Sequence, residues 1–345
     1  HDLKTKIKKQ EIEALAKNLH NVLWGGGGTT DSEIFYSLVN IILAKLQDES
    51  EREDDEEYHF QIHSYGDNTE NLNKVFDRVN DLYRRALREK LNITDEAKIN
   101  KAYVINEEKF PLNKLVYCVS QLEPYSFYDG RNSIDGKDIL GDFFESITRD
   151  GFKQTKGQFF TPTPVVNFIL YAMHLDTYAI ERLNNDRELP YIIDPSAGSA
   201  GFLLHTFQYV LDNEIIEERD RYRYAVNNLF AIDFDPRTVK IAKALMVIAG
   251  DGSTNATHVN SLDLRVWDKD NKAKFDNAIA SKYPNGGFNI IMTNPPFAGD
   301  ISSSSGYLGY YDFARDKKQK TKSSEKRDLL FIERDLKLLK SGRSE

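Results

Sequence analysis

One short segment, Thr293-Asn294-Pro295-Pro296-Phe297, has the residue types needed to act on an amino group. It follows an apolar run, residues 288–292, that is typical of a buried β-strand. Two prolines end the strand ladder and stiffen the loop, so Asn294 is held at a strand's carboxyl end, where open α/β sheets bind ligands. The Asn294 oxygen and a neighbouring backbone carbonyl could accept both N–H donors of an exocyclic amino group, while Phe297 offers a stacking face. A simple Asn-Pro-Pro turn is the alternative.

A second segment, residues 191–202, contains a short β-branched strand, a turn of small residues and the apolar start of a helix. Small residues allow a close approach of the backbone to a ligand, and the helix start offers free N–H groups. Asp194 at the strand end disfavours a phosphate there and favours an amine or hydroxyls. An ordinary strand–turn–helix unit is the alternative. The later Asn-Pro-Pro-Phe strand, about a hundred residues on, makes a ligand site the stronger interpretation.

The two segments together resemble the DNA methyltransferases that transfer a methyl group from S-adenosylmethionine to adenine N6. Within that family they most resemble the modification subunit of type I restriction–modification systems. Gly157-Gln158-Phe159-Phe160-Thr161-Pro162 lies upstream of the small-residue turn, as in the family, and the resemblance covers roughly residues 136–340. Ala200 replaces the family's usual second glycine and Ser196-Ala197 a more usual Ala-Cys. All remain small, so we still expect cofactor binding.

The resemblance implies direct methyl transfer to an adenine flipped out of double-stranded DNA. Asn294 and the Pro295 carbonyl would accept the two N6 hydrogens, and Phe297 would stack on the base. The rate gain would come from positioning, without a strong general base. The catalytic residues that we expect are Asn294, Pro295, Pro296 and Phe297.

The cofactor that the resemblance implies is S-adenosyl-L-methionine. Asp233 ends the next predicted strand after Asp194, where dinucleotide-binding folds place an acid on ribose hydroxyls. A solvated acid is the alternative, and Asp235 reads as a helix cap. The family places Thr161-Pro162 at the methionine end of the cofactor, although a plain helix N-cap fits them as well. The expected cofactor-binding residues are Thr161, Pro162, Asp194, Ser196, Gly198, Gly201, Asp233 and Asn260.

Length and composition predict about two domains without membrane segments. The chain has 345 residues, 40% of them hydrophobic, which is enough for sizeable cores. No apolar run reaches membrane-spanning length and no signal peptide is visible, so we expect no membrane role. The single Cys118 fits a reducing, cytoplasmic environment, and the scattered histidines indicate no metal site. Since residue 1 is His1, we expect a processed or excised chain.

Charge is unevenly distributed along the chain. The net charge is −8, and residues 48–57 hold eight acidic residues and one basic one. Such a run is usually a solvated loop, with a docking tail for a basic partner as the alternative. Residues 315–327 hold seven basic and two acidic residues, and we expect them to contact DNA phosphates unless they form a solvated loop. Residues 299–309, rich in Ser and Gly, are predicted to be mobile.

The first predicted domain, residues 1–135, is mainly α-helical, with helices over residues 7–23, 34–46 and 72–91. Four bases end the last helix; they suit a helix C-terminus and are a weaker candidate for nucleic-acid contacts. They are Arg84, Arg85, Arg88 and Lys90. A turn-rich stretch, residues 129–136, marks the predicted boundary. We expect a helix over residues 139–148 to pack onto the second domain.

The second predicted domain, residues 136–345, alternates strands and helices. Strands are predicted at residues 191–193, 229–232, 258–259 and 288–292, so we expect a Rossmann-like, doubly wound parallel α/β sheet. A further strand should follow the helix at residues 329–339. The family has more strands there, so we expect the catalytic domain to be incomplete on its C-terminal side.

Three other functions remain open from the residues alone. Cytosine-N4 methyltransferases more often have Ser where Asn294 stands, and protein-glutamine methyltransferases use a similar Asn-Pro-Pro loop. The third is a non-catalytic module for cofactor binding or docking. The helical domain and the basic segment favour DNA. The resemblance implies a specificity subunit and a restriction subunit as further partners.

Overall fold

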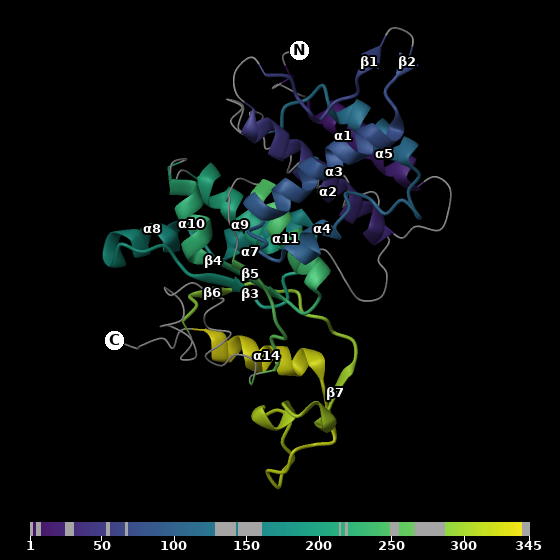
Figure 1. Cartoon of the computed structure of the whole chain (residues 1–345). Helices are drawn as coiled ribbons and strands as arrows, with labels where there is room; N and C mark the ends of the chain where they lie inside the picture. Colours follow the sequence, from purple (N-terminus) through teal and green to yellow (C-terminus); the bar gives the residue numbers. More distant parts are fainter. Residues whose placement is uncertain are drawn as a thin grey trace. The chain divides into compact units, whose positions relative to one another are not determined.

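The computed structural model describes residues 3–4, 8–24, 31–52, 56–65, 68–127, 143, 161–213, 215–217, 220–248, 255–263, 265 and 287–339. The chain forms two compact units. The first contains His1–Thr155 with Val247–Gly252, and the second contains Lys156–Met246 with Ser253–Glu345 (Figure 1). The predicted domain boundary at residue 135 lies outside the described residues.

The described elements of the first unit are five helices and a short hairpin. They are α1 (Lys9–Trp24), α2 (Asp31–Glu51), β1 (Ser64–Tyr65), β2 (Asn68–Thr69), α3 (Leu72–Glu89), α4 (Glu96–Asn100) and α5 (Leu112–Leu122). Helix α3 begins at an Asn71 cap, whose side chain accepts from Asn73 N–H, and buries an apolar stripe. The three helices expected at residues 7–23, 34–46 and 72–91 correspond to α1, α2 and α3.

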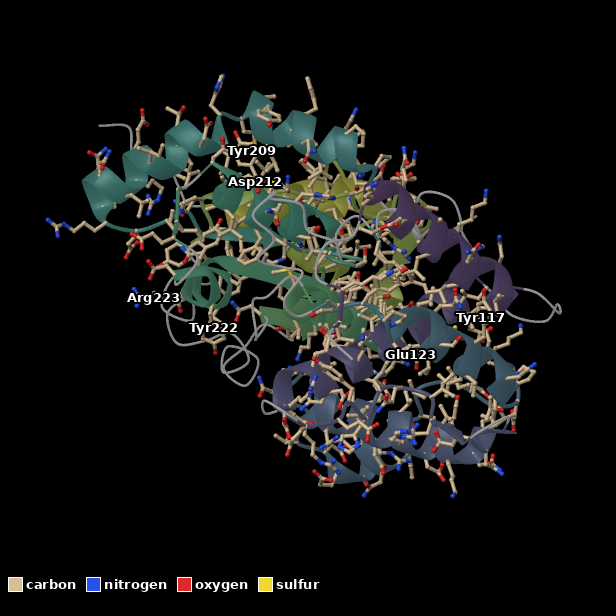
Figure 2. All side chains as sticks on the ribbon, turned by 90° about the horizontal axis from the view of Figure 1, so that it is seen from above. Tyr117, Glu123, Tyr209, Asp212, Tyr222 and Arg223 are labelled. Carbon is tan, nitrogen blue, oxygen red and sulfur yellow. The ribbon has the colours of Figure 1, made fainter. Side chains whose placement is uncertain are left out.

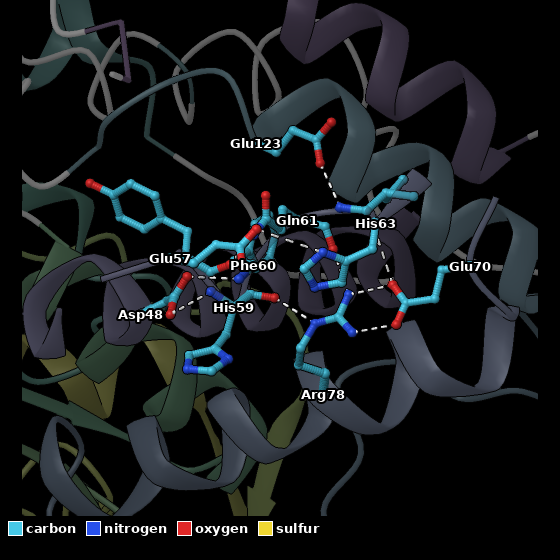
Figure 3. A network of polar contacts seen from close by, with 11 residues as sticks. Asp48, Glu57, His59, Phe60, Gln61, His63, Glu70, Arg78 and Glu123 are labelled. Carbon is cyan, nitrogen blue, oxygen red and sulfur yellow. Dashed lines mark hydrogen bonds and ion pairs between the residues drawn. The ribbon is translucent and has the colours of Figure 1, made fainter. Parts of the chain in front are cut away.

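The acidic run does not form a solvated loop at its start, because α2 extends to Glu51. Asp48 is buried and accepts hydrogen bonds from the backbone N–H groups of His59 at 3.1 Å and Phe60 at 2.7 Å (Figure 3). Glu49 forms a buried ion pair with Lys45 at 2.9 Å. For Asp48 and Glu49 the prediction was therefore wrong: both acids hold the fold together. Residues 53–55 of the run lie outside the described part of the chain.

The basic residues at the end of α3 are engaged within the first unit. Arg84 donates to the carbonyls of residues 100 and 102, and Lys90 donates to Ser50 Oγ at 2.7 Å. Arg85 pairs with Glu51 at 3.0 Å, and Arg88 with Glu96 at 2.8 Å. These contacts favour the structural interpretation of the four bases over a nucleic-acid contact.

Phe143 is the one described residue of the helix expected at residues 139–148, and it belongs to the first unit. Its fully buried ring lies 6.0 Å from the ring of Phe127, another residue of that unit. Phe143 therefore does not show the expected packing onto the second domain. The rest of that predicted helix lies outside the described residues.

The second unit is built on a parallel sheet of four strands in the order β5-β4-β3-β6 (Figure 1). The strands are β3 (Ile192–Asp194), β4 (Leu229–Asp233), β5 (Asn255–His258) and β6 (Ile290–Ile291). The helices around them are α7 (Thr163–Ala172), α8 (Leu175–Asp186), α9 (Gly201–Asp212), α10 (Arg221–Asn228), α11 (Pro236–Ile248) and α14 (Arg327–Leu338). Three of the strands overlap the predicted ranges well, whereas β5 begins three residues before the predicted strand at residues 258–259 and shares only His258 with it. The parallel arrangement of the four strands is confirmed.

Apolar strand residues form the centre of this sheet. Ile193, Phe230, Ile232 and Phe288 are buried in one cluster, and Phe230 meets Phe288 edge-on at 5.7 Å. On α9, Tyr209 meets Tyr171 of α7 edge-on at 5.2 Å (Figure 2). This packing of apolar and aromatic residues holds the sheet together beneath the loops at its carboxyl edge.

Residues 299–326 form a folded lobe between β6 and α14, which corrects the prediction of a mobile segment at residues 299–309. In this lobe β7 (Asp300–Ser302) pairs antiparallel with β8 (Ser324–Lys326), and two short 3₁₀ helices lie between them, η4 (Ser303–Ser305) and η5 (Leu308–Tyr310). Tyr307, Leu308 and Tyr311 are buried against Leu330 and Phe331 of α14. These aromatic and leucine contacts order a segment that its serines and glycines alone suggest is loose.

An isolated parallel bridge joins Leu339, directly after α14, to Phe288, and Phe288 N–H donates to Leu338 O at 3.2 Å. The further strand that we expect after residue 339 is not tested by this bridge. Residues 340–345 lie outside the described part of the chain.

Candidate active site

The carboxyl edge of the sheet brings the predicted site residues together. Asp194 ends β3 and Asp233 ends β4, beside the loops that follow β5 and β6. Backbone hydrogen bonds tie these loops to one another: Ala197 N–H donates to Ile232 O at 2.8 Å, and Val259 N–H donates to Asp233 O at 3.1 Å. Parallel strands end at the same edge, so the expected convergence of these loops is present.

The backbone conformation of the turn after β3 would allow a ligand to lie close to it. Gly198 has φ +54°, and a Cβ at Gly198 or at Gly201 would meet no atom within 4 Å. Open space therefore lies beside the turn. Ala200 has φ +65°, a left-handed conformation that favours glycine. This backbone explains why the related family usually has a glycine at the position of Ala200.

The amide groups of this turn are largely used within the protein. Ser196 N–H donates to Asp194, Gly198 N–H to Asp233 at 3.0 Å, and Ala200 N–H to Ala197 O. A phosphate-binding loop instead offers such donors to its ligand. The geometry thus agrees with the expectation of a ligand carrying an amine or hydroxyls.

Asp194 is a buried structural acid as well as a candidate ligand. It is 1% exposed and accepts from Ser196 N–H at 3.0 Å and from the Thr293 hydroxyl. Burial raises the pKa of Asp194 to about 7, against the lowering effect of those two hydrogen bonds. Its carboxyl group therefore links the turn after β3 to the loop after β6. Direct contact with a cofactor stays a prediction.

Asp233 lies nearer the open side of the turn. One carboxylate oxygen accepts from Gly198 N–H at 3.0 Å and the other from Asp235 N–H at 2.9 Å. Each carboxylate oxygen can accept another hydrogen bond, so hydroxyl donors could still be received. Burial raises the pKa of Asp233. Asp235 accepts from Arg237 N–H at 2.9 Å, which confirms it as the cap of α11.

Asn294 is fixed by a residue far away in the sequence. Its Nδ2 donates to Thr161 Oγ1 at 3.3 Å. The preceding residue, Thr293, lies 2.6 Å from Ser196 Oγ, oxygen to oxygen. Either hydroxyl could be the donor in this contact. Hydroxyl groups therefore hold the Asn294 loop on both sides.

The remaining predicted residues occupy varied positions. Pro295 and Pro296 are half-buried after β6, while Phe297 is 58% exposed. Pro162 is exposed at the start of α7, without a side-chain cap. Asn260 follows β5, and its side chain accepts from Leu262 N–H at 3.0 Å. Their proposed contacts with cofactor or base stay predictions.

Two neighbouring residues were missed by the sequence reasoning. Phe234, directly after Asp233, is 72% exposed, and its carbonyl lies 2.8 Å from His258 Nε2. An aromatic residue behind a strand-end acid is the signal that could have indicated a second stacking face. Thr293 was quoted only as the start of the motif, and nothing in the sequence shows its contact with Ser196.

Comparison with solved structures gives the class of this fold. The chain is 17% identical to a modification subunit of a putative type I restriction enzyme from Vibrio vulnificus YJ016, covering 100% of this chain and 70% of that one, with a TM-score of 0.57. A putative class I S-adenosylmethionine-dependent methyltransferase from Listeria monocytogenes has a TM-score of 0.51 at 12% identity, covering 97% and 71%. The second unit is thus a methyltransferase-type α/β fold.

The family follows from the sequence comparisons. The model for N-6 DNA Methylase matches residues 135–344, so the chain belongs to that family. The methylase subunit of the type I restriction enzyme EcoKI from Escherichia coli is 26% identical over 206 residues, 57% of this chain and 34% of the relative. The restriction enzyme and methyltransferase RM.BcgI from Heyndrickxia coagulans is 25% identical over 202 residues, 59% and 28%. The predicted resemblance is confirmed.

These matches span about a third of the length of the curated relatives. No described helix has the length and apolar character needed to cross a bilayer. Among the described residues there is also no group of three or more His, Cys, Asp or Glu side chains that could hold a metal ion.

Proposed function

We propose that this chain carries the catalytic site of a DNA methyltransferase that transfers a methyl group from S-adenosylmethionine to adenine N6 within a restriction–modification system. The observation that carries the proposal is the attachment of the Asn294 loop to the small-residue turn through Ser196 and Thr293, whose oxygens are 2.6 Å apart. A substrate site and a cofactor site on adjacent strands, β6 and β3, suit transfer between two bound molecules.

The cofactor proposal rests on the surroundings of Gly198 and Asp233. The open space beside Gly198 admits a ligand close to the backbone. Asp233 has oxygen lone pairs left for ribose hydroxyls, and the exposed Phe234 ring offers a face for the adenine. S-adenosylmethionine, when bound, would supply the electrophilic methyl group.

The substrate proposal rests on the orientation of the Asn294 amide. Since its NH₂ group donates to Thr161, its oxygen is the end left to accept from a substrate. That oxygen and the Pro295 carbonyl would accept the two N6 hydrogens, which turns the nitrogen lone pair out of the base plane. Amide oxygens are weak bases, so the surplus N6 proton leaves to water once the nitrogen has gained the methyl group. Phe297 would hold the flipped base by stacking.

Partners and domain roles belong to the same proposal. The relatives are named as type I methylase subunits or as a combined restriction enzyme and methyltransferase, so we propose double-stranded DNA, a specificity subunit and a restriction subunit as partners. Residues 136–345 would supply catalysis, and residues 1–135 would dock a partner. The single cysteine suits work in a reducing cytoplasm.

The chemical identity of the product tests this function. The full-length protein with its partner subunits would be given labelled methyl donor and DNA, and the DNA would then be digested to nucleosides. We expect the label in N6-methyl-2′-deoxyadenosine. Label in N4-methyl-2′-deoxycytidine, or in the glutamine of a protein and not in the DNA, would instead support one of the rival activities and contradict the adenine assignment.

A further inference from the structure

We propose that the lysine-bearing turn of the lobe, formed by Lys317, Lys318 and Lys320, contacts the phosphate backbone of the DNA at the candidate active site. The inference rests on the proposed function, since it names the part of the chain that grips the substrate beside the reacting base. It narrows a run of seven basic residues to the three that share one ordered turn.

The turn is a well-defined structure. Asp316 N–H donates to Lys320 O at 2.9 Å, and Asp316 Oδ1 accepts from the backbone N–H groups of Lys318 at 2.7 Å and Lys320 at 2.9 Å. Gln319 takes a left-handed φ of +63°, which closes the turn. The Asp316 carboxylate is therefore engaged by backbone amides, and the lysine ammonium groups project from an ordered frame.

These three lysines differ from the nearby Lys322 and Arg315, which lie close to acidic side chains. Lys322 pairs with Glu325, and Arg315 lies 3.6 Å from Asp312. Lys317, Lys318 and Lys320 are exposed, and none forms an ion pair with an acid among the described residues. The chain as a whole carries −8, so this local positive charge is a specific feature of the lobe. Three adjacent ammonium groups suit the closely spaced phosphates of a duplex.

The lobe beneath the turn is firmly held. Tyr311 OH donates to Leu262 O at 2.6 Å in the buried lobe core. Glu333 of α14 accepts from the N–H groups of Asp312 and Phe313, at 2.9 Å each. Lys322 also donates to Phe313 O at 2.8 Å. A turn that is already ordered loses less entropy on binding than a loose lysine loop would.

The position of the lobe in the chain favours DNA as the partner that the turn contacts. The lobe begins directly after the catalytic loop, and its base is closed by Arg327 N–H donating to Gly299 O at 3.1 Å, two residues from Phe297. The lobe lies beyond α14 from the sheet (Figure 1). A base that flips toward Asn294 leaves its duplex beside that loop. Phosphates flanking the target base would therefore lie along the chain segment that leaves it.

Salt-dependent DNA binding by the full-length protein with its partner subunits tests the proposal. The triple variant K317E/K318E/K320E would be compared with K17E/K74E/K101E, which reverses three exposed lysines of the first unit and changes the net charge equally. We expect the lobe variant to bind a duplex at least tenfold more weakly in low salt, and to lose about 2 to 3 from the slope of log K against log salt. The control should keep the wild-type slope, and both variants should bind cofactor normally.

The results that would contradict this proposal can be told apart from those that would contradict the proposed function. An unchanged slope in the lobe variant, or an equal loss in the control, would overturn this proposal while leaving the methyltransferase function intact. Normal DNA binding with lost association of a partner subunit would also overturn it, because the turn would then serve a protein surface. If the wild-type protein with its partner subunits bound no DNA, the proposed function itself would fail, and this inference with it.

Discussion

A hydrogen bond to Thr161, which lies 133 positions earlier in the sequence, orients the side-chain amide of Asn294. The family resemblance assigns Thr161 to the methionine end of the cofactor, whereas the structure gives its hydroxyl a contact with the Asn294 amide at 3.3 Å. A hydrogen bond to the donor end of an amide leaves the acceptor end facing the substrate. We therefore interpret Thr161 as a positioning residue for Asn294.

Replacement of Thr161 by valine tests this interpretation, because valine has the same shape without the hydroxyl. Loss of one hydrogen bond worth about 1.4 kcal/mol at the reacting centre would slow methyl transfer about tenfold. Thr161→Ser should restore the wild-type rate. Cofactor affinity should stay unchanged in both variants. Single-turnover transfer rates and titration calorimetry would measure the two quantities.

The opposite pattern would favour the role implied by the family. If Thr161→Val weakened cofactor binding and transferred methyl normally at saturating cofactor, Thr161 would belong to the cofactor site. The motif residues themselves could be predicted from sequence, since Asn-Pro-Pro-Phe and the small-residue turn lie in short segments. The contacts Thr161–Asn294 and Ser196–Thr293 could not, because each joins residues about a hundred positions apart.

At the scale of elements, α14 attaches the lobe to the sheet. Leu330 and Phe331 bury the lobe's aromatic residues, and Arg334 Nε donates to Ser261 O in the loop after β5 at 2.8 Å. Ser261 in turn donates to Pro195 O. The lobe, the β5 loop and the turn after β3 are therefore connected through one helix. A substitution in α14 should affect both the fold and the site.

The carboxyl group of Asp335 on α14 is partly buried, and its burial destabilises the folded protein when the group is ionised. Its Oδ1 is buried without a hydrogen-bond partner among the described residues, and burial raises its pKa to about 7. The native state therefore holds a proton that the unfolded state loses near pH 4. The stability associated with this proton is present below pH 4 and is lost as the pH rises to about 7.

Asp335→Asn should remove this loss, because the amide stays neutral at every pH. We expect a higher urea midpoint than wild type at pH 8 and a smaller fall in stability between pH 5 and pH 8. Some fall should remain, since Asp194 titrates in the same range. The exposed Asp300 provides the matched control, Asp300→Asn, which should behave as wild type. If the urea midpoints of Asp335→Asn and wild type changed with pH by the same amount, this role of Asp335 would be contradicted.

Elements differed in how well the sequence predicted them. Strands β3, β4 and β6 lie in short apolar runs bounded by polar turns, so local pattern alone located them. Strand β5, with the sequence Asn-Ala-Thr-His, has no apolar run, and the sequence placed it three residues too late. The lobe was mispredicted because its Ser and Gly content hides the contacts of Tyr307 and Tyr311 with α14, about twenty residues later. The acids Asp48 and Glu49 were mispredicted because a charge run does not reveal that Lys45 and two backbone amides neutralise and bind them.

For the whole molecule, the family match and the second unit nearly coincide. The match covers residues 135–344, and the sheet, the candidate site and the lobe all lie within that range. Acidic residues dominate the chain overall, yet positive charge gathers on the lobe next to the catalytic loop. The fold class and the basic run thus follow from the sequence, whereas the ion pairs that engage Lys322 and Arg315 are visible only in the folded lobe.

The central claim is that Asn294 acts on the substrate amino group and not on the cofactor. The most direct measurement compares wild type with Asn294→Ala in the full-length protein with its partner subunits. Both methyl transfer to DNA and cofactor affinity would be followed. Losing one of two preorganised acceptors should lower the transfer rate about 10²–10³-fold, by analogy with a lost oxyanion-hole donor, with cofactor affinity unchanged. Methyl transfer by Asn294→Ala at close to the wild-type rate would contradict the account.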